Sequence, residues 1–380
     1  MSNDYLHGPE VDQVNNPKAP IQLVRASTIG CVGVSDDADP VAFPAGTTVL
    51  CDSKEMAAQA GEGPLAVALN DIYRQAETAL VIVRREESGA DEAATLAALI
   101  GQVNADGTRT GIEAMMSAKG EPGIGYKPNI LICPEYSKNA TVGAKLQEVA
   151  IKLKGLPIID GASAEIGALD AQRSQYSKAI VVAPKVLTTD GESYMSATAA
   201  GHIVRVDSTL GYHHSPSNKD MLGIVGTNPT IDHESGETTS LSNRYSEAKV
   251  CTIIKQKNGF KFWGAELSDG SLINHHRISQ VVAESVLRAQ EDAVDGLIDT
   301  PYIDYVLGQL DDLISNLSNN GIIQSGRAWL DRDLNNDASI ANRQIFFDYE
   351  LVYYQVATRT TYRQHARVSS AGEIFDQTEG

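Results

Sequence analysis

Short apolar runs alternate with alanine-rich helical segments over residues 21–206, and this alternation limits the possible folds more than any other feature of the chain. The runs have no polar face and are rich in β-branched residues, at 28–34, 47–51, 78–83, 129–133, 157–160 and 178–186. The helical segments lie between or after them, at 64–76, 92–103, 110–118, 141–154 and 196–206. A strand without a polar face must be covered on both sides. The pattern therefore predicts an α/β region whose sheet has helices on both faces.

The second half of the chain predicts a different, α+β arrangement. Two β-rich runs, 250–254 and 259–263, are joined through an Asn258-Gly259 pair, which is a strong hairpin signal. Apolar residues then recur at helical spacing from Ile278 to Leu297, and the opposite face of this segment is acidic. This pattern predicts a helix of about five turns with one buried face.

A second apolar helix and two further strands are expected near the C-terminus. Thr300 is expected as the N-cap of this helix, Pro301 as its first residue and Gly321 as the residue after its end. The densest run of aromatic and β-branched residues follows at 344–356, and residues 361–370 can form another strand.

The length of 380 residues indicates two domains, at about 150 residues each. Residues 1–20 are rich in Pro and Asn and have no helical period, which predicts an extended arm. We expect the α/β domain at 21–204, the α+β domain at 205–358 and a second arm at 359–380. Because such an arm has no hydrophobic core of its own, we expect it to pair with another part of the protein or with another molecule.

The charge of the chain excludes some classes of partner. Lys and Arg number 31 and Asp and Glu 49, which gives a net charge of −18. Such a surface repels phosphate backbones, so a nucleic-acid partner is not expected. No apolar run approaches the roughly 20 residues that a bilayer span needs, and the N-terminus lacks a signal-peptide pattern. We therefore expect no membrane insertion and no export by the general route.

The four cysteines are far apart and form no CxxC pair. Each lies inside an apolar stretch, at Cys31, Cys51, Cys133 and Cys251. This spacing favours buried free thiols over a disulfide framework or a zinc site.

Two histidine pairs, His213-His214 and His275-His276, are the first candidates for metal binding or catalysis. If they lie on strands, adjacent side chains point to opposite faces, so neither pair by itself can hold one ion. Residues 331–337 have Asp or Asn at every second position, as in a calcium loop. Asn336 and Asn342 stand where that loop needs Gly and Glu, which favours an ordinary polar loop.

Motifs for nucleotide binding or acyl transfer are missing from the sequence. Gly120, Gly123 and Gly125 do not have the dinucleotide spacing, and there is no Walker sequence and no G-x-S-x-G elbow. We therefore assign no catalytic, cofactor-binding or metal-ligating residue, and we expect a protein that is not an enzyme and needs no cofactor.

One segment is more specific than any of these features. Residues 211–219 read G-Y-H-H-S-P-S-N-K and residues 222–226 read L-G-I-V-G. These letters resemble the S-P-S-N-K and G-I-x-G signature of contractile tail sheath proteins, which are found in myophages and R-type bacteriocins. The motif residues are Ser215, Pro216, Ser217, Asn218, Lys219, Gly223, Gly226, Trp263 and Gly264.

The resemblance continues over residues 205–376. Residues 241–243, 252–254, 259–264 and 332–335 look like the family's L-x-N, T-I-I, G-[YF]-x-x-W-G and D-L-N elements. The chain departs from the family at Ala265-Glu266, where Arg-Thr is usual, and at His275-His276-Arg277. The N-terminal α/β part matches in pattern and length more than in letters.

The resemblance implies a structural subunit of a sheath of stacked six-membered rings around a tail tube, assembled in the host cytoplasm as part of a phage tail or tail-like particle. The sheath contracts and drives the tube through a target envelope. Its partners would be other copies of the chain, the tail tube protein, and baseplate and tail terminator proteins. The α/β domain would be the outer domain and the α+β domain the inner one, with both terminal arms exchanged between subunits as β-strands.

Two sets of site residues follow from the resemblance. The acidic helix is the candidate tube contact, with Glu284, Arg288, Glu291, Asp292 and Asp295. The C-terminal strand is the candidate for inter-subunit exchange. It has Tyr362, Gln364, Ala366 and Val368 on one face and Arg363, His365 and Arg367 on the other.

Two alternatives remain beside the sheath interpretation. An α/β enzyme with an oligomerisation domain would have its site at the carboxyl ends of the strands, near Asp160 and Glu135. A tail tube or baseplate protein is the other, although neither is expected to have this two-domain layout with terminal arms.

Overall fold

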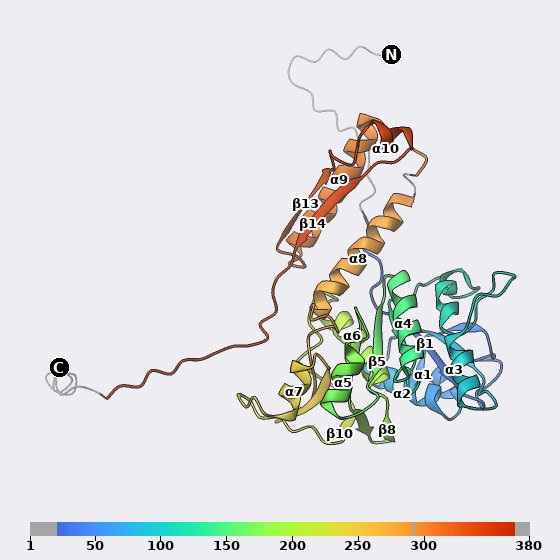
Figure 1. The fold of residues 1–380 in the computed structure, drawn as a ribbon, viewed down its shortest axis with the longest axis vertical. Helices are drawn as coiled ribbons and strands as arrows, with labels where there is room; N and C mark the ends of the chain where they lie inside the picture. The colour runs from blue at the N-terminus through green and yellow to red at the C-terminus, as the bar shows by residue number, and fades with distance from the viewer. Residues whose placement is uncertain (1–20, 292–293, 369–380) are drawn as a thin grey trace, which may run out of the picture.

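The computed structural model describes residues 21–291 and 294–368. They form an α/β unit and an elongated C-terminal unit, and the chain after the last strand runs away from both (Figure 1). The mixed α/β class predicted from the sequence is confirmed. Among the described residues, none of the helices is both long and apolar enough to span a membrane.

A six-stranded sheet with the order β2-β3-β1-β4-β5-β6 forms the centre of the α/β unit. Its neighbouring strands are parallel, except that the edge strand β2 runs antiparallel to β3. The strands are β1 (Thr28–Val34), β2 (Thr48–Cys51), β3 (Leu80–Glu86), β4 (Ile130–Ile132), β5 (Leu156–Asp160) and β6 (Ile180–Val182). Every residue of β1 is buried, as its lack of a polar face predicts.

Helices cover both faces of this sheet, which confirms the layered arrangement. Ile29 and Cys31 belong to one hydrophobic core with α2 and α6, whereas Val32 and Val34 belong to a second core with α3, α4 and η2. The helices of the unit are α1 (Lys54–Ala57), η1 (Ala58–Ala60), α2 (Pro64–Gln75), α3 (Glu92–Ile100), η2 (Gly111–Met116), η3 (Ala118–Gly120), α4 (Ala140–Lys152), α5 (Ile166–Arg173) and α6 (Met195–Thr209).

Two predicted elements differ from the structure. The strand expected at 178–186 is divided into β6 and β7 (Lys185–Thr188) at Pro184, which has no N–H with which to continue the first ladder. β7 instead pairs with β8 (Gly191–Ser193) and β10 (Ile224–Asn228) in a second sheet. The helix expected at 110–118 is the 3-10 helix η2.

A third sheet, in the order β11-β12-β9, packs against the first core. It contains β9 (Lys219–Asp220), β11 (Thr252–Gln256) and β12 (Gly259–Trp263), and α7 (Leu241–Glu247) precedes it. The predicted hairpin is confirmed, but its two-residue turn is Lys257-Asn258, and Gly259 begins β12 with φ of 134°. The first core thus extends to Ile273, beyond residue 204. The outer and inner domains remain predictions about an assembled particle.

The C-terminal unit combines two long helices with a two-stranded hairpin. Its elements are α8 (Ile273–Gln290), α9 (Thr300–Asn319), β13 (Ser325–Leu330), α10 (Asp337–Ala341) and β14 (Phe347–Val352). A third core joins α8 and α9 through residues such as Val282, Leu310 and Leu317, and it also includes Ile21. The segment after Ile21 therefore starts beside this unit and runs to β1.

The ends of the two long helices correct the sequence prediction. α8 stops at Gln290 and not at Leu297, because the later apolar residues have no core to enter and Leu297 is 81% exposed. Asp299, not Thr300, is the N-cap of α9, since its carboxylate accepts a hydrogen bond from the N–H of Tyr302 at 2.9 Å. Gly321 follows the helix with φ of 69°, as predicted.

Candidate functional site

The S-P-S-N-K segment lies in the loop after α6 and forms hydrogen bonds with other elements of the α/β unit. The hydroxyl of Ser217 accepts a hydrogen bond from the N–H of Gly264 at 3.1 Å, and the N–H of Asn218 donates to the carbonyl of Phe262 at 2.7 Å. The ring Nε2 of His202, on α6, lies 2.9 Å from the carbonyl oxygen of Pro216. These motif residues therefore form structural contacts within one copy of the chain.

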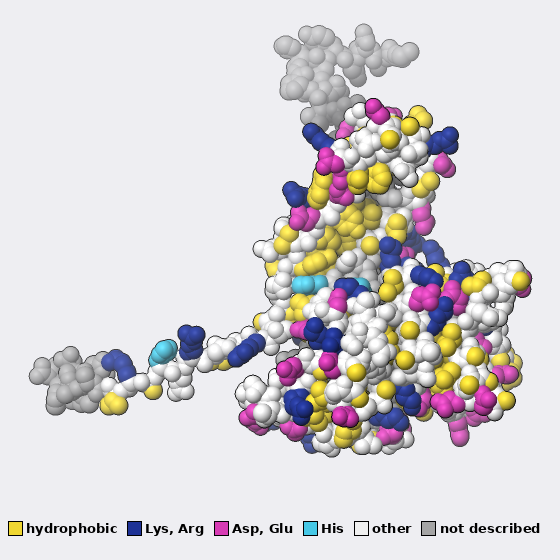
Figure 2. Space-filling view, in the orientation of Figure 1, with side chains coloured by type: hydrophobic (Ala, Val, Ile, Leu, Met, Phe, Trp, Pro, Cys, Tyr) yellow, Lys and Arg dark blue, Asp and Glu magenta, His cyan; other side chains and the backbone are white. Residues whose placement is uncertain are grey.

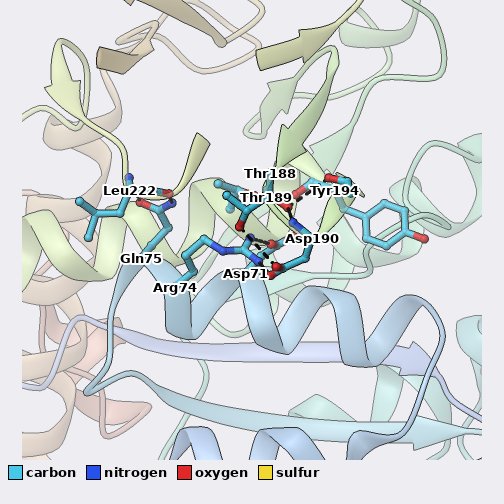
Figure 3. Close-up of polar contacts among 10 residues, drawn as sticks. Asp71, Arg74, Gln75, Thr188, Thr189, Asp190, Tyr194 and Leu222 are labelled. Carbon is cyan, nitrogen blue, oxygen red and sulfur yellow. Dashed lines mark hydrogen bonds and ion pairs between the residues drawn. The ribbon is translucent and has the colours of Figure 1, made fainter. Parts of the chain in front are cut away.

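The second part of the motif is docked on α2 (Figure 3). The side-chain amide of Gln75 accepts from the N–H of Leu222 at 2.9 Å and donates to its carbonyl at 2.6 Å. Gly223 has φ of 67°, and a Cβ on it would lie 2.3 Å from Cδ of Arg74. Glycine is thus required at this position, both by the backbone conformation and by the space.

An ion-pair cluster continues this contact toward the β7–β8 turn (Figure 3). Arg74 pairs with the buried Asp71 and reaches the exposed Asp190 at 2.5 Å. Burial raises the pKa of the Asp71 carboxyl to about 7, although Arg74 opposes the shift. The cluster thus ties α2 to the second sheet.

Gly264 is required at the end of the hairpin, while Trp263 is only half-buried. A Cβ on Gly264 would lie 2.5 Å from Sγ of Cys251, and its φ is 136°. The ring of Trp263 lies 5.1 Å from that of His233. The sequence motif G-[YF]-x-x-W-G therefore marks a close approach of β12 to the strand that precedes it.

Arg277 connects the two units of the chain. Its guanidinium donates to the carboxylate of Asp207 on α6 and to the carbonyl of Ala26 at 3.0 Å. Both charged side chains are almost completely buried, with 2% and 5% of their surface exposed. The hydroxyl of Ser27 also donates to Asp207 at 2.8 Å. Burial raises the pKa of the Asp207 carboxyl, and the charge of Arg277 opposes this.

Other polar contacts follow α8 along the α/β unit. The amide of Gln280 donates to the carbonyl of Gly155 at 2.6 Å, and Lys127 forms an ion pair with Glu284. The N–H of Val24 donates to the hydroxyl of Ser285 at 3.1 Å. α8 is thus attached to the first unit at several levels, while its far end extends away from that unit (Figure 1).

The expected tube-contact residues do not form one surface. Glu284 is half-buried against Lys127, whereas Arg288, Glu291 and Asp295 are exposed near the α8–α9 turn. Asp292 lies outside the described residues. An acidic site here would therefore consist of the residues at the turn, where Leu287, Val294 and Leu297 are exposed as well.

The hairpin β13–β14 is an incomplete sheet. The two strands pair along their whole length, from Ser325↔Val352 to Leu330↔Phe347, and form a sheet of only two strands in the described part of the chain. Each strand therefore has one edge without a partner. No residue of either strand is fully buried, and apolar side chains remain visible on the C-terminal unit (Figure 2).

The described residues of the expected exchange strand, 361–368, make no sheet within their own chain. Residues 353–358 still lie along α8 and the motif loop, whereas residues 359–368 run away from the body without regular structure, and Tyr362 and Val368 are more than 90% exposed. Gln364 and Ala366 are exposed as well. Residues 369 and 370, the end of the predicted strand, lie outside the described range. A pairing partner for this segment remains a prediction.

The two histidine pairs do not lie on strands. His213 and His214 are in a turn with ring centroids 4.3 Å apart, and His275 and His276 are on α8. The ring of His275 stacks on Tyr353 at 4.9 Å. In the part of the chain that the structure covers, no three His, Cys, Asp or Glu side chains gather as metal ligands would.

At the carboxyl ends of the strands, where an α/β enzyme would have its site, the carboxylate of Asp160 forms hydrogen bonds within the fold. Asp160, at the end of β5, accepts hydrogen bonds from the N–H and the hydroxyl of Ser196 at 2.8 and 2.7 Å and from the hydroxyl of Ser137 at 3.1 Å. It therefore stabilises the start of α6. The cavity beside Asp160 and Glu135 has a volume of about 30 Å³, enough for one water molecule.

A larger cleft of about 640 Å³ lies between the motif loop and residues 354–358. Asn274, His213 and Lys249 line it together with the Cys251 thiol. Burial raises the pKa of that thiol to about 12, so the reactive thiolate is not formed near neutral pH. All four cysteines are free and buried, as predicted.

Comparisons with known proteins agree with the motif. No protein-family model matches the chain. A prophage major tail sheath protein of Pseudomonas aeruginosa is 27% identical over 386 residues, covering 98% of this chain and 99% of that protein. The tail sheath protein of Escherichia phage P2 is 28% identical, covering 95% and 96%.

Solved structures share the fold. The contracted helical sheath of the anti-feeding prophage has a TM-score of 0.70 at 15% identity, covering 96% of this chain and 100% of the other. The contracted sheath of an extracellular contractile injection system has a TM-score of 0.66 at 14% identity, covering 97% and 99%. Over nearly its whole length, the chain is thus similar to tail sheath proteins of phages and prophages, as its motifs predicted, and it shares the fold of solved sheath structures.

Proposed function

We propose that the chain is the repeating subunit of a contractile tail sheath. Copies would assemble as stacked six-membered rings around a tail tube, and the lattice would shorten and drive the tube through a target cell envelope. The observation that carries the proposal is the pair of open strand edges on β13–β14 combined with a C-terminal segment whose described residues form no strand. Each open edge presents unpaired main-chain N–H and C=O groups, to which strands from neighbouring copies would add.

Strand exchange suits a lattice that moves. Main-chain hydrogen bonds between an arm and a neighbour's sheet hold while the bodies rotate about the extended linkers. Residues 1–20 would form the second exchanged arm, since the chain enters the C-terminal unit at Ile21. The work of contraction would come from the conformational energy of the lattice, without a nucleotide or another cofactor and without an enzymatic step.

The partners would be other copies of the chain, a tail tube protein, and baseplate and tail terminator proteins. The tube contact would lie at the acidic α8–α9 turn, where Glu291 and Asp295 are exposed. Many weak charge contacts together can bind a long sheath to its tube, and because each contact is weak the sheath can still dissociate from the tube on contraction. Assembly would take place in the host cytoplasm and yield a phage tail or a tail-like particle, with neither nucleic-acid binding nor membrane insertion.

Electron microscopy and sedimentation of the purified chain test this function. A sheath subunit should form wide hollow tubes, whereas an α/β enzyme with an oligomerisation domain should form small closed particles. Removal of residues 1–20 should leave a folded chain that no longer polymerises. Normal tubes from the truncated chain would show that the N-terminal arm has no role in assembly.

A further inference from the structure

The cleft between the motif loop and residues 354–358 differs in charge from the rest of the chain. The protein has a net charge of −18. The described residues that line the cleft nevertheless include two lysines, Lys219 and Lys249, and one acid, Glu266. A cleft that gathers cations in an acidic protein favours an acidic ligand.

Several polar groups of this cleft have no partner in residues 21–291 and 294–368. The side chains of Lys219 and Lys249 form neither an ion pair nor a hydrogen bond there. Nδ1 of His213 and Oδ1 of Asn274 are buried without a hydrogen-bond partner, and only 5% of Asn274 is exposed. Because buried polar atoms in native proteins are almost always paired, a ligand in the cleft would supply the missing partners directly or through water.

The cleft also offers apolar contact surface. Trp263, Ile322 and Val356 line it and are only half-buried. Its volume of about 640 Å³ lies within the range of clefts that bind drug-sized ligands. It can therefore accept a large apolar side chain together with its neighbours in a bound peptide.

The cleft adjoins one end of the β13–β14 hairpin. Gly321 and Ile322, shortly before β13, and residues 354–358, shortly after β14, are part of its wall. The pair Ser325↔Val352 closes the hairpin at this end, which is the end nearer to the α/β unit (Figure 1). A segment that leaves the hairpin here reaches the cleft within a few residues.

The last residues of the sequence have the composition that this cleft favours. Residues 369–380 contain three acids and no Lys, Arg or His. Ile374 and Phe375 stand next to each other in this segment, with an acid on each side. An aromatic anchor between carboxylates fits a cleft that has an apolar wall and two lysines. Residues 1–20 also contain three acids, but they include a Lys and a His and so match the cleft less well.

We propose that residues 369–380 of a second copy bind in this cleft. Ile374 and Phe375 contact the apolar wall, and the acids beside them pair with Lys219 and Lys249. A second copy is the occupant because residues 359–368 run away from the body of their own chain.

This proposal rests on the proposed exchange of the C-terminal arm, which carries residues 369–380 to a neighbour. It adds a contact on another part of that neighbour, between its motif loop and its C-terminal unit. Pairing of strands depends on main-chain groups, whereas this contact depends on side chains and can therefore select the matching segment.

A synthetic peptide of residues 369–380 tests the site without assembly. The receptor is the full chain with Ile374→Ala and Phe375→Ala, so that its own C-terminal segment does not compete. Titration of the fluorescently labelled peptide should give saturable binding. A peptide that carries Phe375→Ala should bind roughly tenfold more weakly or less, because the aromatic anchor is lost.

Two pairs of lysine variants, equal in charge change, test the role of the cleft. Lys219→Glu with Lys249→Glu should weaken binding of the peptide roughly tenfold or more. Lys255→Glu with Lys257→Glu is the matched control, because both residues are exposed near the β11–β12 turn and neither lines the cleft. The control should change binding by less than about twofold at physiological salt.

Disulfide trapping in assembled particles tests the occupant. Ala357 lines the cleft and is exposed, whereas Ala105 is exposed in the loop after α3, so Ala357→Cys and Ala105→Cys are matched probes. Each is co-assembled with a chain that carries Gln377→Cys, and the particles are oxidised. The four native cysteines are buried and leave the reaction to the new thiols. We expect covalent dimers with Ala357→Cys and none with Ala105→Cys.

The remaining outcomes decide against the proposal. No saturable peptide binding, equal weakening by both lysine pairs, or particles without the Ala357→Cys dimer would overturn the site. Tighter binding of a peptide of residues 1–20 would overturn the choice of segment. A cross-link within one chain that carries both Ala357→Cys and Gln377→Cys would overturn the second copy.

The proposed function would survive each of these results. If the unmodified chain forms no large particles, the proposed function fails instead, and the peptide titration still shows whether the cleft binds the segment.

Discussion

The sheets of the two units differ in how completely they are buried within one chain. In the α/β unit every residue of β1 is buried, and hydrophobic cores lie on both faces of the sheet. In the C-terminal unit no residue of β13 or β14 is fully buried, and within the described residues the sheet has two strands. The first unit buries its central strands within one chain, while the second leaves both strands at an edge and keeps apolar surface exposed.

This difference separates two kinds of residue change. A change in the first unit, or in the contacts that attach α8 to it, should alter the stability of a single chain. A change in the C-terminal arm should alter assembly and leave the single chain intact. The following predictions test this separation, beginning with the largest effect.

Ala366→Pro should abolish assembly. Proline removes an N–H and restricts the backbone, so the arm can no longer add a regular strand to a neighbour's sheet. The melting temperature of the single chain should stay the same, because residue 366 makes no strand in its own chain. Melting curves and sedimentation measured together check this, with Ala366→Val as the control that keeps assembly. A large fall in melting temperature with assembly intact would show that the arm closes its own sheet.

Arg277→Met should lower the free energy of unfolding by about 3–5 kcal/mol, because Asp207 would be left buried without its cation. The C-terminal unit loses its main polar attachment, so chemical denaturation should also become less cooperative. The double change Arg277→Met and Asp207→Leu is the matched control and should recover much of the loss. An effect below about 1 kcal/mol for the single change would mean that the pair is open to water.

His202 should make the α/β unit sensitive to acid. Burial lowers the pKa of this imidazole to about 4, from 6.5. Between pH 6.5 and 4 the imidazole of His202 binds a proton in the unfolded chain but stays neutral in the folded chain. The contribution of His202 to the free energy of unfolding is therefore fully present above pH 6.5 and is lost as the pH falls toward 4. The full loss in the free energy of unfolding is about 3 kcal/mol, since each unit of pKa shift corresponds to about 1.4 kcal/mol. Unfolding of the His202→Gln variant across this range should have a smaller pH slope; equal slopes would contradict the assignment.

Glu291→Lys with Asp295→Lys should have the smallest effect on a single chain, within about 0.5 kcal/mol, since both residues are exposed. Under the proposed function, the change should weaken assembly on a tail tube at low salt more than at high salt. Tube-free polymers should form normally. Glu284→Lys is the contrasting variant, because it would place two Lys side by side and disturb the contact with Lys127. Equal loss of both assemblies with the first pair would assign the α8–α9 turn to sheath contacts.

Much of the fold could be predicted because its signals are local. The strands of the first sheet are apolar throughout, and β1 has the residue range predicted for it. The ends of α8 and α9 were harder to predict. Asp299 and Thr300 are adjacent and both can cap a helix, and the apolar spacing up to Leu297 continues after the core beside α8 has ended.

The candidate surfaces were less predictable than the fold. The motif letters S-P-S-N-K and W-G identified the segment, but only the structure shows that they serve contacts within one chain. Glu284 and Glu291 look alike in the sequence, yet one pairs with Lys127 across the unit boundary and the other is exposed. Nothing near Arg277 in the sequence indicates its partner Asp207, which is 70 positions away.

The α/β class, the free cysteines and the similarity to tail sheath proteins could be predicted from the sequence alone, because apolar periodicity and short motifs depend on neighbouring residues. Which charges are buried and which strand edges of the described chain stay open became visible only in the folded chain. Those properties depend on residues that are distant in the chain, such as Arg277 and Asp207 or Tyr353 and His275. Burial and pairing arise only when the chain has folded, so these features could be located only in the tertiary structure.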